Sequence, residues 1–466
     1  MPLSTKSRKV HFVGIGGIGM SGLAELLHNM GHIVSGSDQN AKSERAIALQ
    51  SLGISVSGSH MEETIASKAP DVVVYSSAIN FDNPEIKAAL KLNIPLLQRA
   101  EMLAEILRLY RGIAVAGSHG KTTTTALIAW ILKSGGFDPT IYVGGKFESI
   151  GSNVQLGKGE WMTAEADESD GSFLQLSPEI GVITNIDFEH AGQYKDLSDV
   201  IKSFKDFVKK VPFYGKVIYC LDDPVLFEDF HHHINRPTIT YGFLKERSPD
   251  YLILDERPKF SVLKKADTGY AKLLDFQLSI PGKHNVLNAC AAIAIADELG
   301  VSSSAMQSAC ESFSGVKRRF EFRGLWKEHK IFDDYAHHPT EIQATIDAAL
   351  ERFDRPPIVI FQPHRVSRSR ALWKDFQTCF QNARHVLITD TYLANESPSE
   401  EDQKFLGENF AQNILSPSAE FISSLDLIEK KLNSLKEDGT IKFGDPIFFL
   451  GAGNINSVIP HRIGGE

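Results

Sequence analysis

The stretch Ile113-Ala-Val-Ala-Gly117-Ser118-His119-Gly120-Lys121-Thr122 decides the fold class of this chain. Its first four residues are apolar and predict a short buried strand, whereas Thr122 to Lys133 has the apolar spacing of a helix. A glycine-rich turn lies between the two elements. Strand, turn and helix in this order predict an α/β fold, in which helices cover a parallel sheet.

This turn has the composition of an ATP-binding phosphate loop. Backbone N–H groups and the Lys121 ammonium would surround the β- and γ-phosphates, and the Thr122 hydroxyl would ligate Mg²⁺. The spacing departs from the common phosphate-loop pattern, because only two residues separate Gly117 from Gly120. The predicted ATP-binding residues are Gly117, Ser118, His119, Gly120, Lys121, Thr122 and Thr123.

A second nucleotide-type turn lies nearer the N-terminus. Gly14-x-Gly16-x-x-Gly19 joins a predicted strand, 10–13, to a predicted helix, 20–30, and Asp38 ends the next predicted strand, 32–37. Glycines let the backbone approach a diphosphate, and a helix N-terminus presents free N–H groups to it. The pattern predicts a dinucleotide or a nucleotide diphosphate and does not decide between them.

Polar residues follow several other predicted strands. Glu165-Ala-Asp-Glu168 and Asn185-Ile-Asp-Phe-Glu-His190 end strands at 161–166 and 180–185, where Mg²⁺ ligands of phosphate-loop enzymes lie. In the last third, strands at 330–334, 358–361, 386–390 and 446–450 alternate with a helix at 340–352. Two polar stretches there, 333–341 and 362–370, favour an acidic or zwitterionic small substrate, because arginine pairs bidentately with carboxylates. Between 249 and 277 the pattern is weak and indicates small antiparallel strands.

Composition narrows the class of protein. The 466 residues suggest several domains, and a formal net charge of −9 argues against a nucleic-acid partner. The four cysteines form no Cys-x-x-Cys pair, which argues against a structural zinc site or a disulfide framework. We find neither an apolar leader nor an apolar stretch of membrane-spanning length, so we expect a cytoplasmic enzyme that does not associate with membranes.

Two nucleotide-type turns in consecutive domains are the main functional signal. A dehydrogenase does not need the second turn, and a simple kinase does not need the first. An enzyme that uses ATP together with a nucleotide-linked substrate needs both. An NAD-dependent oxidoreductase and a non-catalytic nucleotide sensor are the alternatives from other functional classes.

Taken together, these residues resemble the Mur ligase family from Val10 to about Asn454. Eight stretches in the family's order support the resemblance: Gly14-Ile-Gly-Gly-Ile-Gly-Met-Ser-Gly22, Arg99-Ala-Glu-Met-Leu-Ala104, Gly117 to Thr125, Glu165-Ala-Asp-Glu-Ser-Asp170, Gly282-Lys-His-Asn-Val-Leu-Asn288, Arg318-Arg-Phe320, Asp334-Tyr-Ala-His-His-Pro-Thr-Glu341 and Phe361-Gln-Pro-His-Arg365. The chain departs from the usual pattern at Ala336, at 189–192 and at 392–396. The resemblance implies an N-terminal Rossmann-like domain (1–110), a central phosphate-loop ATPase domain (111–315) and a C-terminal Rossmann-like domain (316–466).

The resemblance also implies roles for individual residues. The UDP-sugar would be bound by Gly16, Gly17, Ile18, Asp38, Ser77 and Arg99. Beyond the phosphate loop, ATP would contact His284, Asn285 and Asn288. Mg²⁺ would be held by Thr122, Glu165 and His190, and Arg319 would reach the γ-phosphate. The incoming amino acid would be bound by Tyr335, His337, Arg365 and Arg368. Catalysis itself would depend on Lys121, Glu165, His190 and Arg319.

The implied reaction is ATP-dependent amide formation in peptidoglycan precursor synthesis. The lactyl carboxylate of UDP-N-acetylmuramate would be joined to L-alanine through an acyl phosphate, with ATP as co-substrate and Mg²⁺ as cofactor. The nearest alternative is a sister ligase that adds a preformed tripeptide to the same UDP-sugar. The sequence leaves open whether the enzyme is a monomer or a homodimer, and how strictly it selects alanine over glycine or serine.

Overall fold

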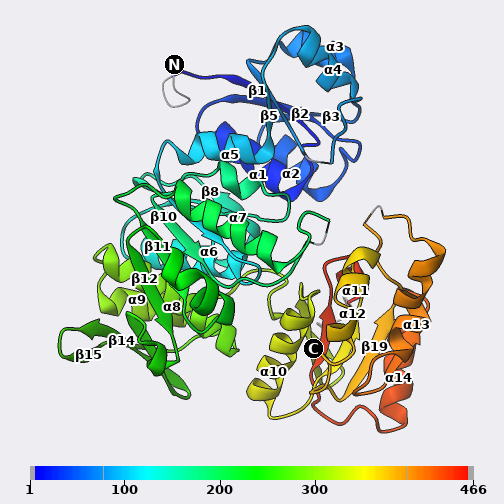
Figure 1. The fold of residues 1–466 in the computed structure, drawn as a ribbon. Coiled ribbons are helices and arrows are strands. Elements are labelled where there is room, and N and C mark those ends of the chain that lie inside the picture. Colours follow the sequence, from blue (N-terminus) through cyan, green and yellow to red (C-terminus); the bar gives the residue numbers. More distant parts are fainter. Residues whose placement is uncertain (1–5, 77, 191, 395, 460–466) are drawn as a thin grey trace. The chain divides into compact units, whose positions relative to one another are not determined.

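The protein is described from a computed structural model that covers residues 6–76, 78–190, 192–394 and 396–459. Its strands form three sheets, each accompanied by helices, which confirms the predicted α/β class (Figure 1). The chain divides into two compact units. The first comprises Met1–Asp187, Ser198–Gln277 and Asn288–Glu311, and contains the first two sheets. The second comprises Phe188–Leu197, Leu278–Leu287 and Ser312–Glu466, and contains the third sheet.

The first sheet is parallel throughout. Its strands lie in the order β3 (Ser55–Ser57), β2 (Ile33–Ser37), β1 (Lys9–Val13), β4 (Val72–Tyr75) and β5 (Leu96–Gln98). Figure 1 shows α1 (Ile18–Asn29), α2 (Glu44–Ser51) and α5 (Arg99–Leu107) on one face, with α3 (Glu62–Lys68) and α4 (Pro84–Lys91) on the other. The strand order reverses between β1 and β4, and ligands of such sheets bind beyond the carboxyl ends at that point.

The second sheet has ten strands and surrounds the phosphate-loop strand. The order is β15-β14-β13-β12-β11-β10-β6-β9-β7-β8. Its parallel part consists of β13 (Tyr251–Glu256), β12 (Thr238–Gly242), β11 (Lys216–Cys220), β10 (Ile180–Ile183), β6 (Arg111–Ala116), β9 (Trp161–Glu165) and β7 (Thr140–Phe147). The associated helices are α6 (Lys121–Ser134), α7 (Leu197–Lys210), α8 (Lys283–Glu298) and α9 (Ser303–Ser312). The carboxyl ends of β9 and β10 therefore flank the loop that follows β6.

Antiparallel strands extend both edges of this sheet. At one edge β8 (Ser152–Gln155) pairs with β7. At the other, β14 (Lys259–Ala266) and β15 (Gly269–Phe276) continue from β13 as an antiparallel meander, while β13 itself pairs in parallel with β12. The meander confirms the antiparallel strands expected between 249 and 277.

The third sheet lies in the second unit. Its order is β16 (Glu321–Trp326), β17 (His329–Asp334), β21 (Ile447–Leu450), β18 (Ile358–Phe361), β19 (His385–Thr389) and β20 (Ala419–Ile422), with only the β16–β17 pair antiparallel. Helix α10 (Pro339–Phe353) follows β17, α11 (Val366–Ala371) and α12 (Trp373–Phe376) follow β18, and α13 (Gly407–Gln412) and α14 (Ile428–Glu437) come later. Helix α10 begins in a capping box between His338 and Glu341, with Pro339 in its first turn.

Buried thiols and mixed surface charge complete the description. All four cysteines are buried, and burial raises the pKa of the Cys220 and Cys310 thiols to about 12.

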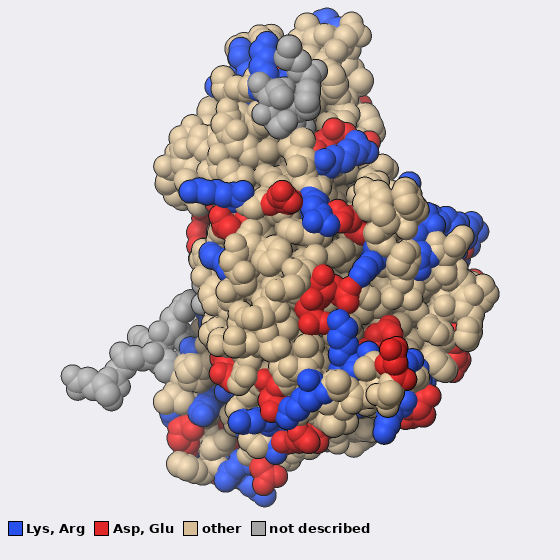
Figure 2. Space-filling view, turned by 90° about the vertical axis from the view of Figure 1, so that its left-hand side faces the viewer, with Lys and Arg blue, Asp and Glu red and all other residues tan. Residues whose placement is uncertain are grey.

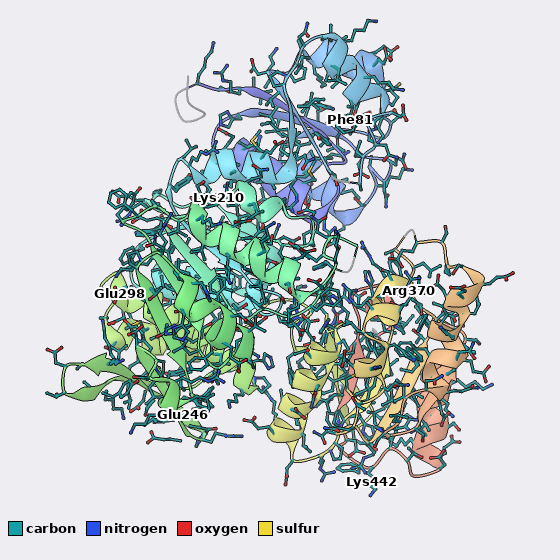
Figure 3. All side chains as sticks on the ribbon, viewed as in Figure 1. Phe81, Lys210, Glu246, Glu298, Arg370 and Lys442 are labelled. Carbon is teal, nitrogen blue, oxygen red and sulfur yellow. The ribbon has the colours of Figure 1, made fainter. Side chains whose placement is uncertain are left out.

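Lys210 and Lys442, labelled in Figure 3, are exposed. On the face drawn in Figure 2, basic and acidic side chains are interspersed, unlike the continuous basic patch of a polyanion-binding protein. Within the described ranges, no helix combines the length and the apolar character required to cross a bilayer.

Candidate active site

The first-sheet turn is held by backbone and carboxylate contacts. The N–H groups of Gly14 and Ile15 donate to the Ser37 carbonyl at 2.8 and 3.1 Å. The Gly16 N–H donates to Asp38 Oδ2 at 2.8 Å. A Cβ at Gly16 would lie 2.8 Å from that same oxygen, so the turn requires glycine there. Asp38 therefore supports the shape of the turn from the end of β2.

The start of α1 follows this turn and has contacts with the second sheet. Gly17 is the N-cap and Ile18 the first helical residue, with no side-chain cap and no acidic residue in the first turn. Free N–H groups at such a terminus suit a phosphate. Tyr142 Oη of β7 donates to the Gly19 carbonyl at 3.0 Å, and Arg99 Nη1 donates to Tyr142 Oη at 3.4 Å. Arg99 thus lies beside the turn, and its role as a UDP-sugar ligand, which the resemblance implies, stays a prediction.

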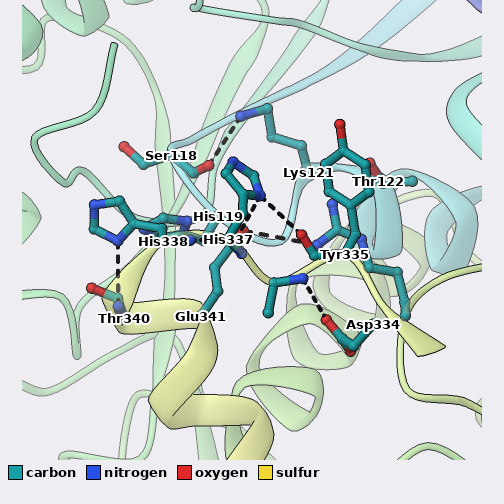
Figure 4. A network of polar contacts seen from close by, with 12 residues as sticks. Ser118, His119, Lys121, Thr122, Asp334, Tyr335, His337, His338, Thr340 and Glu341 are labelled. Carbon is teal, nitrogen blue, oxygen red and sulfur yellow. Dashed lines mark hydrogen bonds and ion pairs between the residues drawn. The ribbon is translucent and has the colours of Figure 1, made fainter. Parts of the chain in front are cut away.

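The phosphate loop has the open backbone that phosphate binding requires. Gly117 and Gly120 have φ angles of 132° and 83°, in the region that favours glycine. The Lys121 side chain turns back over the loop, where Nζ donates to the carbonyls of Gly117 at 2.7 Å and Ser118 at 3.1 Å (Figure 4). It also forms a 2.8 Å ion pair with Glu168 Oε1. The sequence placed Glu168 in the polar stretch that ends the predicted strand at 161–166 but assigned it no role of its own.

Two side chains with oxygen donors lie together, Thr122 at the start of α6 and Glu165 at the end of β9. The Thr122 hydroxyl donates to Glu165 Oε2 at 2.9 Å, and the Gly144 N–H donates to the same oxygen at 2.9 Å. Burial raises the pKa of Glu165, while the Lys121 charge acts in the opposite direction. A hydroxyl and a partly buried carboxylate at this separation are the hard oxygen donors that Mg²⁺ prefers, so the residues present fit the expected cation.

Residues after β10 support the loop from the other side. The His119 N–H donates to Asn185 Oδ1 at 2.8 Å, and the Thr184 hydroxyl donates to the His119 carbonyl at 2.6 Å. His119 Nε2 lies 3.3 Å from Asp187 Oδ2. The sequence placed 185–190 at a strand end but did not single out Thr184. These contacts fix the path of the loop across the end of β10.

The remaining predicted ATP residues lie at the start of α8. Asn288 is close to the phosphate loop, because a Cβ at Gly120 would lie 2.7 Å from Asn288 Oδ1. The Asn285 side chain donates to the Pro281 carbonyl at 2.6 Å. His284 packs against Gly282, where a Cβ would lie 2.6 Å from His284 Cε1. Asn288 belongs to the first unit, whereas residues 278–287 belong to the second.

In the second unit, polar residues gather after β17. The Asp334 carboxylate accepts hydrogen bonds from the N–H groups of Phe320, at 2.7 Å, and Ala336, at 2.8 Å (Figure 4). Burial raises the pKa of Asp334 to about 6. The Arg319 guanidinium lies 5.2 Å from the centre of the Tyr335 ring. The structure therefore places Arg319 and Tyr335 together on this edge of the third sheet.

Two of the predicted amino-acid residues, His337 and Arg368, contact the same carboxylate. Glu189 Oε1 lies 3.2 Å from Arg368 Nη2 and 3.4 Å from His337 Nε2. Arg368 Nη1 also donates to the His364 carbonyl at 3.1 Å. Burial, with the nearby charge of Arg368 second, lowers the pKa of His364 to about 3, so this ring is neutral at pH 7. The loops after β17 and β18 thus bring His337, His364 and Arg368 together, with two carboxylates beside them: that of Glu189, and that of Glu341, whose Oε2 lies 3.3 Å from His337 Nδ1.

Arg365 lies at the start of α11 with an unusual backbone. Its φ angle is 68°, its N–H donates to the Tyr392 carbonyl at 2.8 Å, and its side chain is exposed. Strained non-glycine residues of this kind cluster at ligand sites. His190 also has a positive φ, 55°, and its Nε2 lies 3.7 Å from Glu189 Oε2. Glu165 and His190 belong to different units. Ser77 lies outside the described residues.

Comparison with protein families assigns all three parts of the chain. The "Mur ligase family, catalytic domain" matches residues 9–111, the "Mur ligase middle domain" residues 115–296, and the "Mur ligase, glutamate ligase domain" residues 318–453. These matches follow one another and cover most of the sequence. The chain belongs to the Mur ligase family. The resemblance inferred from the eight sequence stretches is therefore confirmed.

Several curated relatives of this Mur ligase have the same name. This chain is 46% identical over 454 residues to the UDP-N-acetylmuramate–L-alanine ligase of Bdellovibrio bacteriovorus, and the match covers 96% of each chain. It is 45% identical over 459 residues to that of a Sulfurihydrogenibium species, covering 97% of this chain and 96% of the relative. Among solved structures, the UDP-N-acetylmuramate–alanine ligase of Thermotoga maritima matches with a TM-score of 0.75 and 31% identity over 97% of each chain. A murein peptide ligase from Psychrobacter arcticus matches with a TM-score of 0.70 and 25% identity, over 99% of this chain and all of that one.

Proposed function

We infer that this Mur ligase joins the lactyl carboxylate of UDP-N-acetylmuramate to L-alanine at the expense of ATP. The observation that supports this most strongly is the pair of nucleotide-type turns at the carboxyl ends of β1 and β6. Relatives named for this reaction are 42–46% identical to the chain along almost its whole length. The sister reaction with a preformed tripeptide ranks second, because the murein peptide ligase is only 25% identical.

The first turn and the phosphate loop would each bind one of the two nucleotides. We propose that the α1 N-terminus at Gly17 and Ile18 binds the UDP diphosphate, with Arg99 beside it. Asp38 contributes by holding Gly16. ATP occupies the loop from Gly117 to Thr123. Asn288 lies against Gly120 of this loop, and His284 and Asn285 precede Asn288 at the start of the same helix. An oxidoreductase would leave the Lys121 ammonium without a role.

The proposed cation site uses the oxygen atoms at the start of α6. Thr122 and Glu165 would hold Mg²⁺; His190, the third ligand that the resemblance implies, stays a prediction from the sequence. Bound there, the ion would neutralise charge on the phosphates. Mg²⁺ prefers oxygen to nitrogen, so the assignment depends more on Glu165 than on His190.

The chemistry required of the side chains is mainly positioning. A carboxylate is a poor electrophile, and transfer of the γ-phosphoryl group turns it into an acyl phosphate. The alanine amine then attacks the acyl carbon, and inorganic phosphate leaves the tetrahedral intermediate. Lys121 and Arg319 stabilise the negative charge on the transferring group through fixed cationic donors.

The amino acid would bind in the second unit, where His337, His364 and Arg368 come together. We propose that Arg368 and Arg365 pair with its carboxylate, and that Tyr335 and His337 line the site. The proposed domain limits are 1–110, 111–315 and 316–466, which agree with one sheet in each segment.

A phosphate-release assay tests the proposal. Release should require ATP, UDP-N-acetylmuramate and L-alanine together, and omission of any one should abolish it. Glycine and L-serine in place of L-alanine measure selectivity, and a tripeptide tests the sister reaction. Release with the tripeptide but not with alanine would reassign the enzyme, whereas NADH-linked absorbance change without phosphate release would exclude a ligase.

A further inference from the structure

The Glu189 carboxylate lies among the groups proposed to receive the substrate's carboxylate. Its Oε1 atom is 3.2 Å from the Arg368 guanidinium and 3.4 Å from the His337 ring. Only 6% of its side chain is exposed. Glu189 belongs to Phe188–Leu197, a segment of the same compact unit as Arg368 and His337. These contacts therefore arise within one unit.

Arginine side chains surround this carboxylate, and a second carboxylate, that of Glu341, lies 3.3 Å from the other nitrogen of the His337 ring. Arg318 and Arg365 lie close enough to affect His364, whose ring stacks on Tyr392 with centroids 5.5 Å apart. A carboxylate in such a position forms charge-assisted hydrogen bonds, which are stronger than neutral ones. An incoming amino acid presents the same chemical group, one carboxylate, to the same donors.

We propose that Glu189 is an internal substitute for the substrate carboxylate, which the amino acid must displace from Arg368 and His337 in order to bind. The inference rests on the proposed function, because it takes Arg368 as a ligand of the amino acid. Its new content is that Glu189 competes with the substrate. The apparent affinity for amino acid is then reduced by the fraction of enzyme in which Glu189 occupies the pocket.

This competition has a consequence for the free enzyme. When Glu189 occupies the pocket, its negative charge balances the positive charge of the Arg368 guanidinium, and small carboxylates in solution are excluded. A substrate succeeds when its own carboxylate and its amino group together bind better than the internal carboxylate. A monocarboxylate without an amino group, such as propionate, lacks the second contact and should bind weakly to the native enzyme.

Glu189→Gln tests the proposal because it keeps the shape and removes the charge. We expect KM for L-alanine to fall about three- to tenfold, since the internal competitor is weakened. The inhibition constant of propionate against L-alanine should fall in parallel, while KM for ATP stays unchanged. Glu189→Asp, which withdraws the carboxylate by one methylene group, should act in the same direction and serves if the glutamine variant does not fold.

A matched control is available in the same unit. Glu420 also contacts a histidine and a cation, with its Oε1 3.4 Å from His385 Nε2 and its Oε2 paired with Lys431. Glu420→Gln should leave KM for L-alanine and propionate inhibition unchanged. A fall in KM in this control as well would indicate a general charge effect and would overturn the assignment to Glu189.

Arg368→Lys separates failure of this inference from failure of the proposed site. If that variant leaves KM for L-alanine unchanged, the amino-acid pocket itself is misplaced. If it raises KM while Glu189→Gln leaves KM unchanged, the pocket stands and only the competition is refuted. A rise in KM in Glu189→Gln would mean that Glu189 helps to bind the amino acid, which also refutes the proposal.

Discussion

Replacing Lys121 with methionine separates the catalytic role of its charge from the stability that it provides. Lys121 Nζ lies 2.8 Å from Glu168 Oε1, and the two side chains are 12% and 2% exposed. At an effective dielectric constant of about 20, this attraction is worth about 6 kcal/mol. Removal of one partner of a buried pair typically costs about 3–5 kcal/mol after relaxation. For the domain that contains the pair, a loss of about 3 kcal/mol would lower the melting midpoint by roughly 6–12 °C.

The double variant Lys121→Met/Glu168→Gln distinguishes the two roles. Removing the second charge should restore most of the melting midpoint, because no unpaired buried carboxylate remains. Phosphate release at saturating substrates should stay about 10²–10³ below the native rate in both variants. Thermal melting and the phosphate-release assay measure the two quantities on the same samples. Near-native turnover in either folded variant would refute the placement of ATP at this loop.

Three further outcomes follow from contacts described above. Gly117→Ala should raise KM for ATP at least about tenfold in a kinetic assay, because φ is 132° and the new Cβ would lie 2.0 Å from Thr184 Oγ1. Tyr142→Phe removes the bond to the Gly19 carbonyl and should weaken UDP-N-acetylmuramate binding about three- to tenfold in calorimetry; unchanged affinity would separate Tyr142 from the UDP site. Burial lowers the pKa of His364 from 6.5 to about 3, so its contribution to stability is complete above pH 6.5 and is lost as pH falls towards 3. Melting curves of His364→Gln should therefore depend less on pH in that window, and an identical pH profile would contradict this.

Local sequence was sufficient to predict most elements that carry the site. The strand at 113–116 and the helix at 122–133 appear as β6 and α6, with ends within two residues of those predicted. Both depend on neighbours along the chain, namely apolar spacing and glycine-rich turns. Short elements such as β3 and β5, with three residues each, were missed because so few residues establish no period.

Partners distant in the sequence could not be predicted in this way. Glu168 pairs with Lys121 because β9 lies directly beside β6, although β7 and β8 intervene in the chain. Sequence periodicity identifies strands but does not give their order in a sheet. Tyr142 was missed for the same reason, since its hydrogen bond to Gly19 links residues 123 positions apart.

Because all four cysteines are buried, the surface of this enzyme presents no thiol that reacts readily with thiol reagents. The reactive form is the thiolate, and the raised pKa of Cys220 and Cys310 keeps it scarce at neutral pH. A thiol introduced at Lys210 of the first unit and another at Lys442 of the second would therefore take up a maleimide dye without removal of the native cysteines. Each dye would report on the surroundings of its own unit during turnover in an otherwise unaltered enzyme.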